Sequence, residues 1–202
     1  AELRQRLPGV LAYNCYGQSE VGPLATILRP EEHDGRLTSA GRPVLNVETR
    51  VVDETMNDVP PRTVGEIVHR SPQLITCYWN KPEETARALR HGWLYTGDLA
   101  RRDADGFIYI VDRSKDMIIS GGENVYSAAV ENVIYGFPGV HECAVIGIPH
   151  EQWGEAVHAI VVPRPGAEID VAAVATQLAA ARTAGDDAAI ARLEAMQVAV
   201  TN

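Results

Sequence analysis

The strongest constraint on the fold is a series of short segments in which apolar and polar residues alternate. Gly, Pro, Asn and Asp residues separate these segments between Gly35 and Val111, and the clearest of them read VETRVVD, GEIVHR and GFIYIVDR. Alternation with a period of two turns one face of a strand toward a core and the other toward solvent. The sequence therefore predicts an antiparallel, β-rich unit over about residues 35–111. One helix is expected inside it, in KPEETARAL, because Pro82 suits a first helical turn and acidic residues follow.

The pattern changes after Arg113 to strand, helix, strand, strand. KDMIIS, HECAVIGIP and EAVHAIVVP are strand-like, and SAAVENVIYGF is an amphipathic helix with Ser127 as its expected N-cap. Such a change predicts a second, smaller α+β unit, with the boundary at residues 112–116, so that the fold class is α/β to α+β. The Ala-rich residues 170–202 are expected to form a helical hairpin that breaks at Gly185–Asp187.

Two short polar stretches interrupt these patterns. YGQSEVGP, which begins at Tyr16, is expected to follow a helix end and a short apolar strand at Val10–Tyr13. WLYTGDLA is expected to place Thr96–Asp98 in a tight turn. An aromatic ring, a hydroxyl and carboxylates gathered in two such turns favour a binding site over ordinary loops.

Composition narrows the range of partners and compartments. A formal net charge of −9 and a pI near 5.1 argue against binding to nucleic acid, which requires clustered Lys and Arg. No apolar run reaches the roughly 20 residues that span a bilayer, and the opening residues lack a signal-peptide pattern, so a cytoplasmic protein without a transmembrane segment is expected. Three widely separated cysteines, Cys15, Cys77 and Cys143, predict buried thiols and no disulfide framework.

Four stretches, in this order along the chain, resemble one known family. They are YGQSE, GEIVHRSPQLITCYWNKPEETARAL, WLYTGDLA and DRSKDMIISGGENVY. Over about residues 10–165 the chain is similar to the adenylate-forming (AMP-binding) superfamily, and in particular to its acyl-CoA synthetase branch. The resemblance implies that residues 1–111 form the C-terminal part of a large AMP-binding domain with a distorted-barrel subdomain, that residues 112–116 form a hinge, and that residues 117–202 form a small mobile domain.

The resemblance also implies a reaction and roles for residues of the first two stretches. A carboxylic acid, fatty or aryl, attacks the α-phosphate of ATP to give an acyl-adenylate, and coenzyme A then takes the acyl group. Tyr16 and Gly17 are expected along the adenine, Ser19 at the α-phosphate, and Glu20 at the Mg²⁺ ion, for which a hard oxygen ligand is suitable. Asp98 is expected to accept hydrogen bonds from both ribose hydroxyls.

Further roles fall on the stretch that follows the boundary. Arg113 corresponds to the family arginine that contacts the nucleotide, and Lys115 to the hinge position. Gly121, Gly122 and Glu123 correspond to the loop that lines the pantetheine tunnel during transfer to coenzyme A.

Two departures from the family pattern define the alternatives. The upstream phosphate loop has no counterpart in the sequence, and no lysine occurs after Lys115, where the family carries one that supports adenylation. We therefore expect a C-terminal portion with a divergent tail that is inactive as an isolated chain, either a fragment or a split-gene product. A peptide-synthetase adenylation domain and a non-catalytic remnant with an interaction role are the alternatives, and oligomeric state is not predicted.

Overall fold

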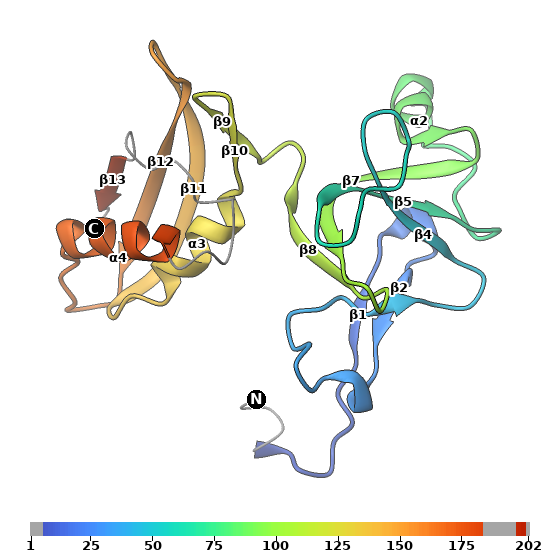
Figure 1. Cartoon of the computed structure of the whole chain (residues 1–202), viewed down its shortest axis with the longest axis horizontal. Coiled ribbons are helices and arrows are strands. Elements are labelled where there is room, and N and C mark those ends of the chain that lie inside the picture. Colours follow the sequence, from blue (N-terminus) through green and yellow to red (C-terminus); the bar gives the residue numbers. More distant parts are fainter. Residues whose placement is uncertain (1–5, 184–196, 201–202) are drawn as a thin grey trace. The chain divides into compact units, whose positions relative to one another are not determined.

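The computed structural model describes residues 6–183 and 197–200, and the chain divides into two compact units, Ala1–Val111 and Asp112–Asn202 (Figure 1). The helix expected at the start of the chain falls mostly on residues 1–5, outside the described residues. Among the described residues, no helix has both the length and the apolar character that a membrane span requires.

The first unit opens with a small antiparallel sheet of β1 (Asn14–Tyr16), β2 (Thr26–Leu28) and β3 (Arg42–Pro43). The predicted strand at Val10–Tyr13 is wrong, because those residues form no strand and β1 begins only at Asn14. Pairing decides this boundary, since the three residues of β2 pair on this side with Asn14–Tyr16 and not with Val10–Tyr13.

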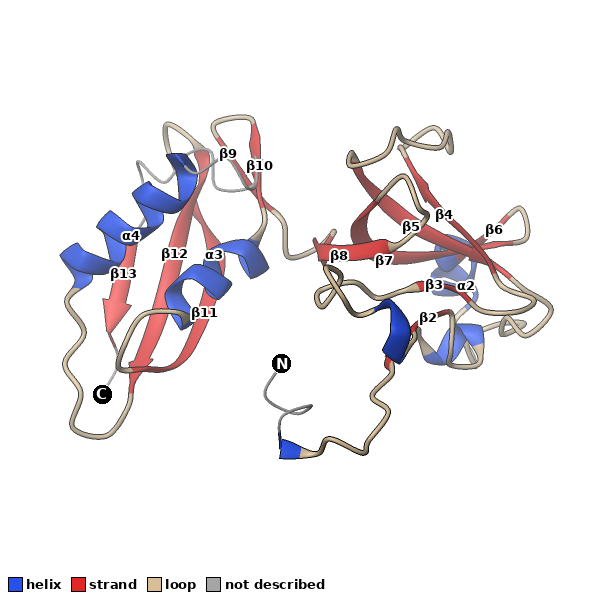
Figure 2. Cartoon of the chain, turned by 60° about the horizontal axis from the view of Figure 1, so that its bottom comes forward, coloured by secondary structure: helices blue, strands red, loops and turns tan. Residues whose placement is uncertain are grey.

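The larger sheet of the first unit contains five strands and confirms the predicted antiparallel, β-rich unit. Their order is β4-β5-β7-β6, with β8 beside β7 (Figure 2). The strands are β4 (Glu48–Val52), β5 (Val64–Arg70), β6 (Leu89–Arg90), β7 (Trp93–Arg102) and β8 (Ile108–Arg113). The predicted helix is also present as α2 (Pro82–Ala88), with Pro82 in its first turn.

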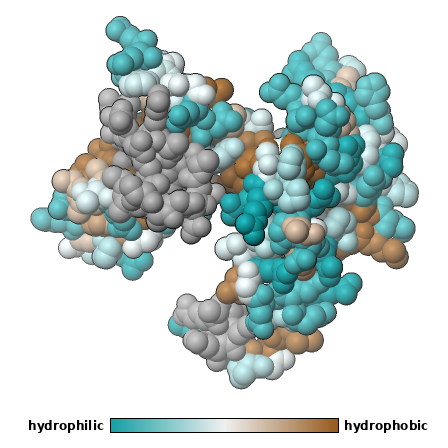
Figure 3. Space-filling view, in the orientation of Figure 1, coloured by the Kyte–Doolittle hydropathy of each residue, from teal (hydrophilic) through white to brown (hydrophobic). Residues whose placement is uncertain are grey.

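Alternation along the strands of this sheet gives it an apolar interior. Val51, Ile67, Ala100 and Ile108 form one buried cluster, and the ring of Tyr16 packs against it. The surface of the β-rich unit in Figure 3 is mostly hydrophilic, with apolar residues in small separate patches. Tyr16 is therefore attached to the hydrophobic core of the larger sheet.

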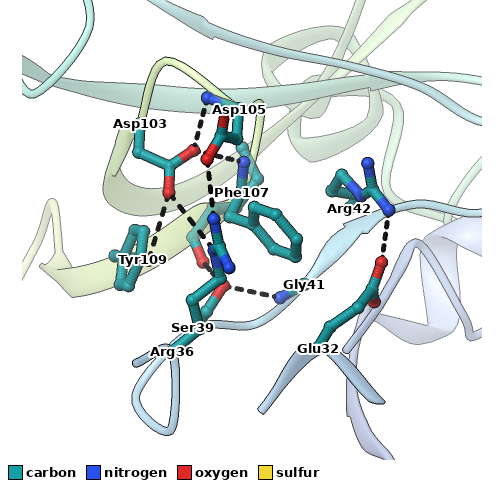
Figure 4. Close-up of polar contacts among 10 residues, drawn as sticks. Glu32, Arg36, Ser39, Gly41, Arg42, Asp103, Asp105, Phe107 and Tyr109 are labelled. Carbon is teal, nitrogen blue, oxygen red and sulfur yellow. Dashed lines mark hydrogen bonds and ion pairs between the residues drawn. The ribbon is translucent and has the colours of Figure 1, made fainter. Parts of the chain in front are cut away.

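A polar cluster fixes the turn that joins β7 to β8. Asp103 accepts backbone N–H groups of Asp105 and Phe107 at 3.0 and 2.9 Å, which closes the turn (Figure 4). The guanidinium groups of Arg36 and Arg42 lie 4.3 and 4.7 Å from the centre of the Phe107 ring. This cluster holds the segment around Arg36–Arg42 against the start of β8.

The second unit is a sheet with two helices on one face. Its elements are β9 (Ile118–Ser120), β10 (Glu123–Val125), α3 (Ser127–Tyr135), β11 (Val140–His150), β12 (Gly154–Pro163), α4 (Val171–Thr183) and β13 (Gln197–Val200). The strand order is β10-β9-β12-β11, and β13 lies parallel beside β12. Val130 and Ile134 of α3 share one core with Val174 and Leu178 of α4. The α+β class predicted for this unit is therefore confirmed.

Two details of the second unit differ from prediction. Ser127 is the first residue of α3 and not its N-cap, which is Tyr126; the Ser127 hydroxyl instead donates to Asp112, with its shorter contact 3.0 Å to Oδ2. The end of the expected helical hairpin is wrong, because Gln197–Val200 is a strand that gains hydrogen bonds from the edge of β12. The break predicted at Gly185–Asp187 lies outside the described residues.

The prediction of buried cysteines is also wrong for two of the three. Cys15 and Cys77 are exposed, and Cys143 is partly buried. Cys15 lies in β1, an edge strand of the three-stranded sheet, and Cys77 lies in the segment before α2.

Candidate functional site

Asp98 is held by two side chains from the segment that follows β1. The Tyr16 hydroxyl donates to Asp98 Oδ2 over 2.7 Å, and Gln18 Nε2 donates to the same oxygen over 3.0 Å. Asp98 is only 7% exposed, so both donors fix a carboxylate with little access to water. Sequence reasoning missed Gln18, although it lies between Tyr16 and Ser19 in the stretch that it singled out.

The tight turn predicted at Thr96–Asp98 is wrong, because these residues lie inside β7. Glu66 pairs with Leu99 and Val68 pairs with Tyr95, so three residues of β7 oppose the single residue Ile67 of β5. The three residues form a bulge, and Gly97 at its centre has a φ of 72°, which a glycine adopts without strain. The sequence Thr-Gly-Asp suits a turn locally. Residues before and after it pair with β5, however, so the strand continues through it.

Glu20 lies in a short 3-10 turn, Ser19–Val21, and is joined to a different partner. The Tyr78 hydroxyl donates to Glu20 Oε1 over 2.7 Å. Burial, together with the hydrogen bond and the negative charge of Glu20, raises the pKa of Tyr78 to about 12. The phenol therefore stays protonated at neutral pH and acts as a donor to the carboxylate. Ser19, at the start of the turn, is exposed.

Gly17 allows the chain to fold back closely between β1 and β2. A Cβ atom at this position would lie 1.9 Å from the carbonyl oxygen of Pro23 and 2.8 Å from the nitrogen of Ala25. The Ala25 N–H donates to the Tyr16 carbonyl over 2.9 Å, which closes this loop. Only a residue without a side chain fits here, so Gly17 shapes the loop that carries Tyr16, Ser19 and Glu20.

His69 lies beside the ring of Tyr16, and the two ring planes are tilted by 46°. The two ring centroids are 6.0 Å apart, and His69 Nδ1 is 2.9 Å from Thr49 Oγ1. His69 is fully buried, and burial lowers its pKa to about 4. A neutral imidazole at this depth supports the aromatic ring without introducing a charge near Asp98.

The remaining predicted site residues follow the boundary between the units, which falls inside β8 after Val111. Arg113 ends β8 and Lys115 lies in the turn after it; both are exposed, and the Arg113 carbonyl accepts the Asp116 N–H over 3.0 Å. Gly121 and Gly122 form the two-residue turn between β9 and β10, with φ angles of 60° and 83°. Positive φ at both positions is the geometry of a type I′ hairpin. Glu123 follows in β10, so the predicted loop is a tight hairpin.

The residues that could bind a metal ion are few. Within the described ranges, no group of three or more His, Cys, Asp and Glu residues could hold one. Mg²⁺ in nucleotide sites commonly takes one or two carboxylates and obtains its other ligands from phosphate and water. The single carboxylate of Glu20 fits that kind of site and does not fit a metal cage formed by the protein alone.

Comparison with known families agrees with this arrangement. The family described as AMP-binding enzyme matches residues 1–79, and the AMP-binding enzyme C-terminal domain matches residues 129–199. The chain therefore belongs to the AMP-binding, adenylate-forming superfamily, as its motifs predict. Its curated relatives include acyl-CoA and fatty-acid-CoA ligases, which is the branch that the motifs resemble.

Two relatives illustrate the degree of similarity. A feruloyl-CoA synthase of Amycolatopsis sp is 46% identical over 162 residues, which cover 80% of this chain and 33% of that protein. A medium/long-chain-fatty-acid–CoA ligase of Mycobacterium tuberculosis is 48% identical over 175 residues, which cover 86% of this chain and 30% of that protein. The chain spans about a third of the length of these curated relatives.

Solved structures of two enzymes are similar to this chain along almost its whole length. The o-succinylbenzoate-CoA synthetase of Bacillus subtilis, solved with its acyl-adenylate intermediate, has a TM-score of 0.83 and 31% identity, and the match covers 98% of this chain and 39% of that one. An amide bond synthetase from Marinactinospora thermotolerans has a TM-score of 0.78 and 36% identity, and the match covers 94% of this chain and 38% of that one. The fold is therefore that of adenylate-forming enzymes.

Proposed function

We propose that this chain supplies the adenosine side of the nucleotide site, the hinge and the small mobile domain of an AMP-forming acid–CoA ligase. One observation carries the proposal: a buried carboxylate, Asp98, is held by Tyr16 and Gln18 at a bulge of β7. A carboxylate fixed in this way is a suitable acceptor for the paired hydroxyls of a ribose. The relatives' names support the reaction class, because they include feruloyl-CoA synthase and fatty-acid–CoA ligases.

The first unit binds and orients the nucleotide. Asp98 accepts from the ribose hydroxyls, the Tyr16 ring lies along the adenine beside Gly17, and the Ser19 hydroxyl donates to the α-phosphate. Glu20 holds Mg²⁺, with Tyr78 fixing one of its carboxylate oxygens. The ion, when bound, neutralises the charge of the phosphates during displacement. A solved structure of a relative contains ATP and a magnesium ion, which supports ATP and Mg²⁺ as the molecules bound here.

The second unit serves the change from adenylation to thiol transfer. Residues 112–116 act as the hinge, with Lys115 at the hinge position, and Arg113 contacts the nucleotide. The hairpin turn at Gly121–Gly122 and the adjoining Glu123 lie along the pantetheine arm of coenzyme A. A turn without side chains lets the backbone approach a narrow ligand closely.

We propose that the 202-residue chain alone binds nucleotide without forming an acyl-adenylate. Adenylation requires positive charge at the α-phosphate, and the printed sequence has no lysine after Lys115. Two functions compete with this proposal. One is an interaction role without catalysis, and the other is acyl transfer to a carrier protein instead of coenzyme A.

The test is an acid-dependent adenylation assay on the full protein that carries this chain. ATP, Mg²⁺ and hydroxylamine are supplied with a panel of fatty and aryl acids, and acyl-hydroxamate is measured; coenzyme A then replaces hydroxylamine. We expect hydroxamate and acyl-CoA from the same acids. Hydroxamate without acyl-CoA would favour a carrier-protein acceptor, and no hydroxamate with any acid would favour a non-catalytic role.

A further inference from the structure

The bulge beside Asp98 is held by side chains where the regular pairing of β5 and β7 fails. Three residues of β7 oppose one residue of β5, so the backbone groups of the extra residues cannot all meet partners across the ladder. The Gly97 N–H instead donates to the side chain of Glu66, at Oε1, over 3.0 Å. Buried or half-buried N–H groups require such a partner, and Glu66 provides it from the neighbouring strand.

Thr96 fixes the other side of the bulge. Its hydroxyl donates to the Ile67 carbonyl over 2.7 Å and accepts the Asp98 N–H over 3.0 Å. One hydroxyl therefore connects the backbone of β5 with the backbone of Asp98. Thr96 and Gly97 are thus bonded to two consecutive residues of β5, and Asp98 is attached to β5 through Thr96.

The bulge decides where the Asp98 side chain points. Successive side chains of a strand alternate between the two faces of a sheet, so a change of one residue in register turns a side chain to the opposite face. In the observed register the Asp98 carboxylate accepts hydrogen bonds from Tyr16 and Gln18. Gly97 has a φ of 72°, and a Cβ atom there would meet nothing within 4 Å, so backbone conformation and not space restricts this position.

We propose that Glu66 is a positioning residue for Asp98: by accepting the Gly97 N–H it holds the β7 bulge in the register that presents the Asp98 carboxylate to ribose. Glu66 touches neither nucleotide nor acid and acts through the backbone of Gly97. The inference rests on the proposed function, because it takes Asp98 to be the ribose acceptor.

The test measures ribose selectivity, which a general loss of stability would not change. Binding of AMP and of 2′,3′-dideoxy-AMP to the full protein is measured by calorimetry or competition, and the ratio of the two dissociation constants is compared among variants. Hydrogen bonds to a charged group give an expected wild-type preference for AMP of about tenfold or more. Glu66→Ala should bring this ratio close to one, whereas Glu66→Gln, which keeps a carbonyl acceptor, should retain most of it.

Two further variants keep the experiment decisive if Glu66→Ala is poorly folded. Thr96→Val removes the other attachment of the bulge and should also bring the ratio of dissociation constants close to one. Thr96→Ser keeps the hydroxyl and should preserve the wild-type ratio. Glu48→Ala is the matched control, because Glu48 pairs with Arg70 at the edge of the same sheet and does not contact the bulge. The ratio in this control should equal that of the wild type.

The possible outcomes separate the inference from the function beneath it. If Asp98→Ala leaves the ratio unchanged, the proposed ribose contact is wrong and the inference falls with it. If Asp98→Ala brings the ratio close to one but folded Glu66→Ala does not, the ribose contact stands and the positioning role of Glu66 is overturned. If Glu66→Ala does not fold, an unchanged ratio in Thr96→Val overturns it instead.

Discussion

The Tyr78 hydroxyl and the Glu20 carboxylate are joined by a hydrogen bond of 2.7 Å, although 58 positions separate them in the sequence. A second link connects the same two segments, because the Ile75 N–H donates to the Glu20 carbonyl over 2.9 Å. The segment between β5 and α2 therefore supports the 3-10 turn that carries Glu20 at both its backbone and its side chain.

Tyr78→Phe should lower the rate of adenylation by about tenfold, since a hydrogen bond to a charged group contributes roughly 1.5–3 kcal/mol. Affinity for AMP should change little, because the lost contact orients a metal ligand. Pyrophosphate release at saturating ATP gives the rate. Tyr109→Phe is the control, because Tyr109 also donates to a carboxylate, that of Asp103, away from this turn. Equal rates in wild type and Tyr78→Phe would remove Tyr78 from the site.

Asp98→Ala and Glu20→Ala should have different kinetic signatures. Asp98→Ala should weaken AMP binding and adenylation together, by about tenfold or more, because ribose contacts are present in both the ground state and the transition state. Glu20→Ala should lower the adenylation rate far more than nucleotide affinity, because charge neutralisation matters most in the transition state. Small and equal effects of both changes would contradict the assigned roles.

The isolated 202-residue chain should bind AMP weakly, near the millimolar dissociation constants that correspond to about −4 kcal/mol. It should release no pyrophosphate with any acid of the panel. Ligand-observed NMR measures the binding, and a coupled pyrophosphate assay measures the reaction. Turnover that rises with protein concentration and disappears in Asp98→Ala would show that the chain needs no further cation.

Gly17→Ala should destabilise the first unit by about 2–4 kcal/mol, because an added methyl group would overlap the Pro23 carbonyl and force the loop open. AMP binding should fall as well, since the loop carries Tyr16. Gly9→Ala is the matched control: nothing lies within 4 Å of a Cβ atom there, and a change within about 0.5 kcal/mol is expected. Urea denaturation measures both, and equal stability of the two variants would refute the steric argument.

His69 should make the stability of the first unit depend on pH. Its pKa is about 4 in the folded protein against an ordinary 6.5, so only the unfolded chain takes up a proton between these values. The corresponding stability is complete above about pH 6.5 and is lost as the pH falls toward 4, by about 2 kcal/mol between pH 7.5 and pH 5. His69→Gln should remove this part of the pH dependence. Urea unfolding at several pH values measures the free energy of unfolding. An identical dependence of this free energy on pH in wild type and variant would contradict the prediction.

Local sequence determined most of the secondary structure. Alternation in VETRVVD and GEIVHR was sufficient to predict β4 and β5, and Pro82 followed by acidic residues was sufficient for α2, because these signals depend on neighbours a few positions away. The motifs were likewise sufficient for the family. The roles of Ser19, Glu20 and Asp98 stay predictions, because they depend on ligands.

Only the tertiary structure decided how the site is held together. Thr96–Asp98 read locally as a turn, and pairing with β5 made it a bulge inside a strand. The partners of Asp98 and Glu20, which are Tyr16, Gln18 and Tyr78, come from distant segments, and no local pattern encodes such pairs. The physical reason is that strand register and side-chain hydrogen bonds are settled between segments, after each segment's own preference has fixed only its type.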